Sequence, residues 1–174
     1  AAVAPCLAAS TAAAQRPDFA AFDAYVAKAV KAWNVPGLAI AIVANDSVVF
    51  AKGYGVRTLG RPEPVDAHTR FAIGSTTKAM TALALLQAAD DGKLRLDEPV
   101  LRHLPTMQLY DPVMTRELLV RDLLTHHTGL PGSDQLWAGN DYSIGEIIRR
   151  MRFLKPTASF RNQYAYQNVQ YAMA

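Results

Sequence analysis

The spacing of apolar residues predicts a helix followed by a hairpin in the first third of the chain. Between residues 19 and 33 apolar side chains recur every three or four positions, as on one face of an amphipathic helix, and the pattern stops before Pro36. Residues 38–44 are apolar without a break, which is typical of a strand covered on both faces. The turn Asn45-Asp46 and the β-rich run 47–56 complete an antiparallel hairpin.

A second long helix is predicted to begin at Ser75. Its interior, residues 79–89, is apolar on nearly every face, which favours burial among other elements. Gly92 then supplies a left-handed cap. Shorter helices are expected after Asp97, around 120–125, and from the capping-box spacing of Ser143 and Glu146 to a point before Pro156.

These elements divide the chain into a helix and hairpin at 16–60, a helix at 75–91 and a helical region at 95–174. We expect residues 16–174 to be the N-terminal part of one domain. A two-stranded hairpin is not a stable sheet alone, so other strands are expected to complete it. The last residues before Ala174 are expected to begin a new helix.

Composition and charge exclude several classes of protein. The chain is 51% apolar and 19% charged, as in an ordinary globular protein. The net charge is only +3, and Lys and Arg are scattered rather than clustered, so we expect no nucleic-acid partner. Beyond the first residues, no apolar run approaches the roughly 18 residues of a transmembrane helix.

Residues 1–15 have the composition of a signal-peptide remnant. The segment is rich in Ala, carries no charge and ends in small residues that a signal peptidase accepts. It holds the only cysteine, Cys6, so the mature protein would have no thiol or disulfide. This predicts a periplasmic or secreted protein; a disordered Ala-rich tail is the alternative.

Ser75 and Lys78 form the first candidate for chemistry. Their i, i+3 spacing places a hydroxyl and an amine side by side on the first turn of a helix. A Lys whose charge is disfavoured by an apolar environment can accept the Ser proton, and the helix N-terminus favours the negative charge that develops. The alternative is a Ser N-cap followed by a solvent-facing Lys.

Three segments together resemble one family. Residues 71–78 (Phe-Ala-Ile-Gly-Ser-Thr-Thr-Lys) resemble the nucleophile segment of class C β-lactamases and penicillin-binding proteins. Residues 120–131 are similar to a loop of that superfamily, and residues 164–168 (Tyr-Ala-Tyr-Gln-Asn) to its Tyr-x-Asn element. The segments occur in the family's order, and the resemblance covers nearly everything after Arg16.

The resemblance implies an α+β fold of the β-lactamase/transpeptidase type. This fold has an antiparallel sheet flanked by helices, with an all-α subdomain, and it would be incomplete here at the C-terminus. Ser75 would be acylated by an amide, lactam or ester carbonyl, with its own backbone N–H as one oxyanion donor. Tyr166 would share the proton with Lys78 as general acid/base. Asn168 would hydrogen-bond both Lys78 and the substrate amide.

Several alternatives stay open within this interpretation. Tyr164 lies near Tyr166 in sequence, but only Tyr166 has an Asn two residues on; either could simply be a packing aromatic. The substrate would be a β-lactam, a D-amino-acid peptide or an ester. A β-lactamase, a D,D-peptidase and an esterase share these motifs, and a non-hydrolytic penicillin-binding sensor, an inactive homologue or a helical interaction module are further alternatives.

Two other motifs are left out of the predicted site. His127-Thr128-Gly129 imitates the family's third motif but precedes the Tyr element, so we interpret it as a loop turned at Gly129. Ser133-Asp134-Gln135 imitates Ser-Asp-Asn and is interpreted as a loop. The four His residues form neither a Ser-His-Asp pattern nor a paired metal spacing, and no phosphate-binding glycine loop occurs, so no cofactor or metal is expected.

The strands that carry the family's third motif and its second oxyanion donor have no counterpart in these 174 residues. Activity of this chain alone is therefore open. We also expect uncovered apolar surface on the hairpin and the helices, and hence association or poor solubility.

Overall fold

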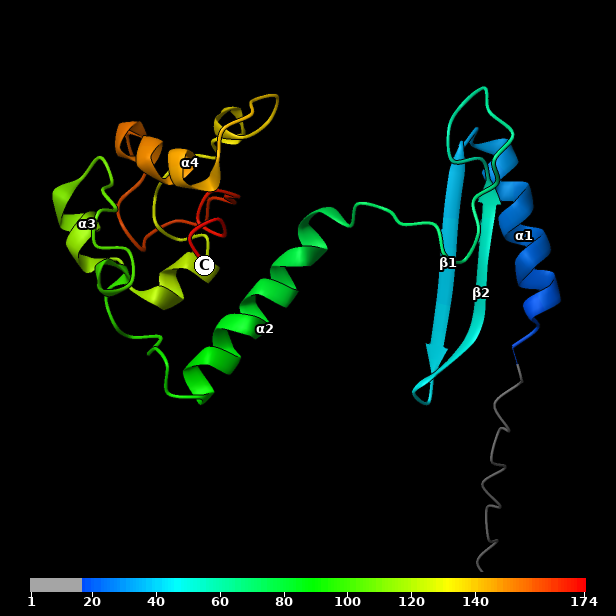
Figure 1. Cartoon of the computed structure of the whole chain (residues 1–174), viewed down its shortest axis with the longest axis horizontal. Coiled ribbons are helices and arrows are strands. Elements are labelled where there is room, and N and C mark those ends of the chain that lie inside the picture. Colours follow the sequence, from blue (N-terminus) through cyan, green and yellow to red (C-terminus); the bar gives the residue numbers. More distant parts are fainter. Residues whose placement is uncertain (1–16) are drawn as a thin grey trace, which may run out of the picture. The chain divides into compact units, whose positions relative to one another are not determined.

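The computed structural model describes residues 17–174, so the predicted signal-peptide remnant and Cys6 lie outside the described residues. Contacts divide the chain into two compact units, with the boundary between Ala72 and Ile73 (Figure 1). Each unit is a separate body with its own elements.

The first unit contains helix α1 (Phe19–Ala32) and the hairpin of strands β1 (Gly37–Ala44) and β2 (Ser47–Gly55). The Asp18 side chain caps α1 by accepting the Ala21 N–H at 2.9 Å. The strands pair antiparallel, and both turn residues, Asn45 and Asp46, have positive φ, as tight hairpin turns require. The predicted helix and hairpin are therefore confirmed.

Helix α1 covers one face of the hairpin. Phe50 of β2 stacks on Phe19 at 5.7 Å between ring centroids and meets Phe22 edge-on at 5.4 Å. Farther along the same face, Asp23 accepts hydrogen bonds from Lys52 at 2.6 Å and from Tyr54 at 2.7 Å.

The opposite face of the hairpin carries small residues. Because side chains alternate along a strand, Ala41 and its partner Ala51 point away from α1, and both are exposed. Within the first unit, helix α1 thus covers only one face of β1. Gly53 lies on this second face, where the backbone of Val65 passes so close that a Cβ would meet its carbonyl oxygen at 2.2 Å.

The second unit is mostly short helices and loops. Ser75 lies in a 3₁₀ turn, Gly74–Thr76, that leads into the longest helix of this unit, α2 (Thr77–Asp90). The remaining helical segments are the 3₁₀ turn Val100–Arg102, α3 (Pro112–Glu117), the 3₁₀ turns Val120–Leu124 and Asp134–Leu136, α4 (Ile144–Arg150) and the 3₁₀ turn Met151–Phe153.

Two of these helices, α3 and α4, begin at an N-cap residue whose side chain accepts an N–H of the first turn. Ser143 accepts the Glu146 N–H at 3.2 Å, as the capping-box spacing predicts for α4. Asp111 caps α3 in the same way, with Pro112 in the first turn. Helix α3 was not predicted, although Asp111-Pro112 is a typical start of a helix. At the end of the chain, where a new helix was expected to begin, residues 169–173 adopt turns, and the Ala174 N–H donates to the Gln170 carbonyl at 3.3 Å.

A single cluster of buried apolar side chains forms the core of the second unit. Its members are Val100, Met107, Leu109, Met114, Leu118, Val120, Leu123, Leu130, Ile147, Met151 and Val169. Helix α2 packs against this cluster through Leu85, but Met80 and Leu83 are 62% and 58% exposed. Within the second unit, the core therefore covers one face of α2 and leaves this other face free.

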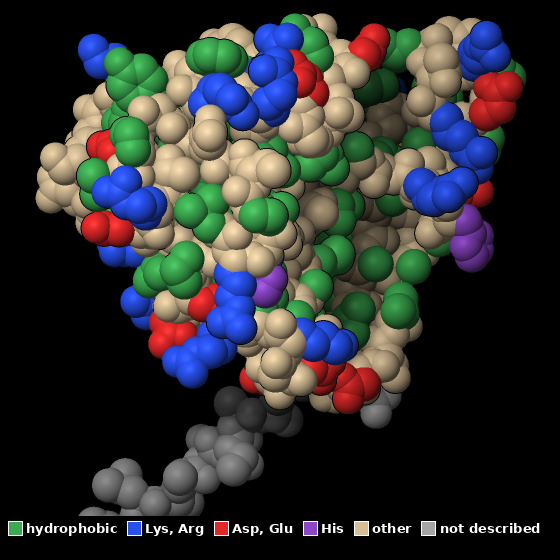
Figure 2. Space-filling model, turned by 60° about the vertical axis from the view of Figure 1, so that its left-hand side comes forward, with side chains coloured by type: hydrophobic (Ala, Val, Ile, Leu, Met, Phe, Trp, Pro, Cys, Tyr) green, Lys and Arg blue, Asp and Glu red, His purple; other side chains and the backbone are tan. Residues whose placement is uncertain are grey.

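Charges of both signs are mixed on the surface. On the face shown in Figure 2, Lys and Arg side chains stand among Asp and Glu side chains. Within residues 17–174, no helix is both long and apolar enough to cross a membrane.

Candidate active site

Ser75 and Lys78 meet at the start of α2. Gly74 precedes them with φ +53°, a conformation that favours glycine, and it turns the chain into the helix. The Lys78 Nζ donates to Ser75 Oγ at 3.1 Å. Ser75 is exposed and Lys78 is partly buried.

The Tyr-x-Asn element lies against this pair. The Tyr166 hydroxyl donates to Ser75 Oγ at 2.5 Å, and Lys78 Nζ donates to Asn168 Oδ1 at 2.5 Å. The structure thus brings together all four residues that the sequence singled out. Tyr164, the rival of Tyr166, is 58% exposed and packs its ring against His126 and His127 instead.

Lys78 also sets the electrostatics of Tyr166. Its Nζ lies 4.8 Å from the centroid of the Tyr166 ring. The Lys78 ammonium first, and then the hydrogen bond with Ser75, lower the pKa of the Tyr166 phenol below its ordinary value of 10.0. The Tyr166 phenolate therefore forms at a lower pH than that of a tyrosine in water.

The segment that carries Tyr166 and Asn168 has no regular secondary structure, and the loop 126–131 holds it in place. The carbonyl of His126 accepts the Ala165 N–H at 2.8 Å, and Nδ1 of the same His accepts the Gln167 N–H at 3.1 Å. The Gln167 side chain donates to the Pro131 carbonyl at 2.9 Å. This role of His126 was not predicted, because the His residues were considered only as a triad base or as metal ligands.

Gly129 turns this loop, as predicted. Its φ is +79°, and a Cβ there would lie 2.3 Å from the Ala158 carbonyl oxygen. Both the conformation and the close approach require glycine.

Asp134 was left out of the predicted site, and the structure places its carboxylate in contact with Asn168. One carboxylate oxygen of Asp134 accepts both the Asn168 Nδ2 at 2.8 Å and the Trp137 Nε1 at 3.0 Å. The Asn168 amide is thereby fixed with its oxygen toward Lys78. Asp134 was not predicted because Gln135 stands where the Ser-Asp-Asn motif has Asn. The mismatch at this third position led to the whole motif being set aside, although its Asp is present.

A cavity of about 330 Å³ opens beside Ser75. Ser75, Lys78 and Asn168 form its polar side. Trp137, Ile147, Val169 and Ala172 add an apolar wall. Its volume is at the lower end of the range of small-molecule sites, about 300–1,000 Å³. In the part of the chain that the structure describes, no three His, Cys, Asp or Glu side chains gather as metal ligands.

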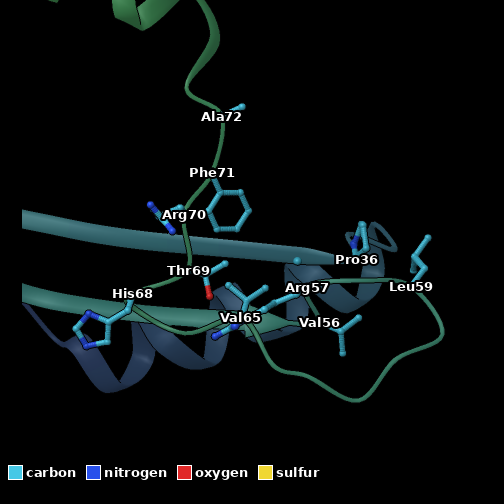
Figure 3. Close-up of a pocket in the computed structure, with 11 residues that line it drawn as sticks. Pro36, Val56, Arg57, Leu59, Val65, His68, Thr69, Arg70, Phe71 and Ala72 are labelled. Carbon is cyan, nitrogen blue, oxygen red and sulfur yellow. The ribbon is translucent and has the colours of Figure 1, made fainter.

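A larger hollow of about 670 Å³ lies in the first unit (Figure 3). Val65, His68 and Phe71 are among its lining residues, and its Arg57 is already paired with Asp66 at 3.0 Å. It contains no nucleophile beside a base, so the chemistry favours the smaller cavity as the active site.

Comparisons with known proteins identify the family of this chain. The family described as Beta-lactamase matches residues 22–174. Unguisins hydrolase ungD of Aspergillus violaceofuscus (strain CBS 115571) is 33% identical over 170 residues, which covers 88% of this chain and 28% of that protein. This chain therefore spans under a third of that relative's length.

Solved structures show the same fold. The octameric penicillin-binding protein homologue from Pyrococcus abyssi superposes with a TM-score of 0.75 at 28% identity, over 90% of this chain and 37% of that one. The D-amino acid amidase from Ochrobactrum anthropi SV3, complexed with L-phenylalanine, gives a TM-score of 0.70 at 23% identity, over 86% and 41%. The fold prediction is thus supported for part of the β-lactamase/transpeptidase fold.

Proposed function

The chain belongs to the Beta-lactamase family, and from this premise we propose that its protein is a serine hydrolase that works through an acyl-enzyme on Ser75. The observation that carries the proposal is the pair of hydrogen bonds that Ser75 Oγ receives from Lys78 and Tyr166. A serine needs such neighbours because its hydroxyl is a weak nucleophile at its own pKa.

Acylation would begin once Tyr166 is ionised. The phenolate takes the Ser75 proton while Oγ bonds to the substrate carbonyl carbon, and the Lys78 ammonium stabilises the charge on both oxygens. The Ser75 backbone N–H is one donor to the oxyanion. Collapse breaks the bond to the leaving amine or alkoxide, which takes the proton back from Tyr166. Water then attacks the ester with Tyr166 again as base, releases the acid and restores the Ser75 hydroxyl.

The surroundings of Ser75 favour a carbonyl substrate with an apolar acyl group. Asn168 lines the cavity and would bond a substrate amide, and the wall that includes Trp137 and Val169 would contact the acyl chain. Amides, lactams and esters all satisfy these demands. Hydrolysis also agrees with the name of the relative at 33% identity, a hydrolase.

Mass spectrometry of the full gene product tests the proposal. We expect a β-lactam and an activated ester each to leave an acyl adduct on Ser75 that disappears with time. Ser75→Ala should abolish the adduct, whereas Ser47→Ala, at the exposed first residue of β2, should not. A permanent adduct would favour a penicillin-binding sensor, and turnover by Ser75→Ala would contradict the assignment of the nucleophile.

A further inference from the structure

We propose that His126 is a positioning residue for Tyr166: it holds the backbone on both sides of that tyrosine and so keeps the phenol on Ser75 Oγ. This inference rests on the proposed function. Its basis is that the residues before and after Tyr166 both donate their N–H groups to His126, Ala165 to the carbonyl oxygen at 2.8 Å and Gln167 to Nδ1 at 3.1 Å.

These two hydrogen bonds are important because no helix or strand fixes the segment that carries Tyr166. Neither helix nor strand includes Tyr166, so its place depends on individual contacts. The His126 ring is 8% exposed and lies 4.6 Å from the Tyr166 ring, centroid to centroid. His126 therefore restrains the tyrosine through two hydrogen bonds and through ring packing.

The bond to Gln167 requires one charge state of His126. Nδ1 can accept only when it carries no proton, so the ring must be neutral with its hydrogen on Nε2. The groups that face the ring are Lys78, His127 and the phenols of Tyr164, Tyr166 and Tyr171, with no carboxylate among them.

This environment keeps His126 neutral. Burial, followed by the charges of Lys78 and His127, lowers the pKa of His126 below its ordinary value of 6.5. A lowered pKa means that the neutral ring stabilises the folded site above pH 6.5. This contribution is lost as the pH falls through the lowered value. Protonated Nδ1 would then point a donor at the Gln167 N–H and break the restraint.

Two variants separate the hydrogen bond from the ring. His126 has φ +58°, which Asn tolerates well, and an Asn side chain can accept near the Nδ1 position, so His126→Asn keeps the acceptor and removes the ring. His126→Phe keeps an aromatic ring and removes the acceptor. His127→Phe is the matched control, since the His127 ring contacts Tyr164 but not Tyr166.

The experiment measures the rate of Ser75 acylation by an activated ester in the full gene product. We expect His126→Phe to lower the acylation rate constant roughly 10- to 100-fold with a smaller change in KM, because the phenol is displaced from the reacting oxygen. We expect His126→Asn to stay within about 3-fold of the wild type and His127→Phe to match it.

The pH profile supplies the second readout. Below the lowered pKa of His126 the wild-type rate should fall more steeply with acid than that of His126→Asn, because only the wild type loses the acceptor. Equal rates for His126→Phe and wild type, or identical acid limbs for wild type and His126→Asn, would overturn the inference. If His126→Phe does not fold, the comparison of the acid limbs of wild type and His126→Asn still tests the inference. Absence of a Ser75 adduct in the wild type would instead refute the proposed function.

Discussion

Tyr166 lies with its phenol oxygen against Ser75 Oγ and its ring near the Lys78 ammonium, a combination that lowers its pKa. Because the phenolate is the proposed base, the acylation rate should rise with pH, with a midpoint below the ordinary tyrosine pKa of 10.0. Tyr166→Phe removes the base, so we expect the rate to drop by about 10²- to 10⁴-fold and the rise to disappear.

Stopped-flow kinetics with an activated ester across a range of pH would measure both effects. Tyr164→Phe is the control, because the structure shows no hydrogen bond from Tyr164 to Ser75 among the described contacts. A Tyr166→Phe variant with the wild-type pH profile would assign the base to another group.

At the residue level, the sequence was enough to select candidate site residues where their spacing or a family motif fixes how the side chains meet. The i, i+3 separation places Lys78 on Ser75 through the helix itself, and the Tyr-x-Asn element identified Tyr166 and Asn168 through the family. Asp134 and His126 were missed for a physical reason. Each acts through a contact with a segment over 30 residues away, and such contacts leave no local pattern.

Among the elements, the 3₁₀ turn Asp134–Leu136 connects the polar and apolar sides of the cavity. The Trp137 indole follows this turn and donates to the same Asp134 oxygen that holds Asn168. Trp137→Ala would remove the largest side chain of the apolar wall. We therefore expect kcat/KM for esters with long or aromatic acyl chains to fall roughly 10-fold, while acetyl esters change little.

The control for this change is Trp33→Ala, which removes the other tryptophan, an 83% exposed side chain in the first unit. Kinetics with a series of nitrophenyl esters of increasing acyl length would measure the selectivity. An equal loss for all chain lengths would show that Trp137 acts only through the Asp134 network and not through the acyl group.

Helices and strands were predictable where a local sequence feature determines them. The 3.6-residue period gave α1, the turn residues gave the hairpin, and the capping box gave the start of α4. Burial was less predictable, because the periodicity of α2 shows how apolar its faces are and not which partners cover them. Helix α3 was missed because its six residues are too few to show a period.

At the scale of the molecule, α2 presents apolar side chains that the rest of the second unit leaves uncovered. Met80, Leu83 and Leu86 are 62%, 58% and 42% exposed. Monomeric proteins rarely leave a contiguous apolar face of this kind in water. We therefore expect the 174-residue chain, expressed alone, to self-associate through α2 at micromolar concentration, with a sedimentation coefficient that rises with concentration.

Leu83→Lys should weaken this association, since a charge on the buried face of an oligomer is costly. Gln108→Lys, at an exposed polar position of the second unit outside α2, adds the same charge away from this apolar face and should leave the association intact. Circular dichroism should show equal helix content in both variants, so that a difference in sedimentation reports on the surface alone. A wild-type chain that sediments as a monomer at every concentration would mean that this face is stable in water, and α2 would then need no partner.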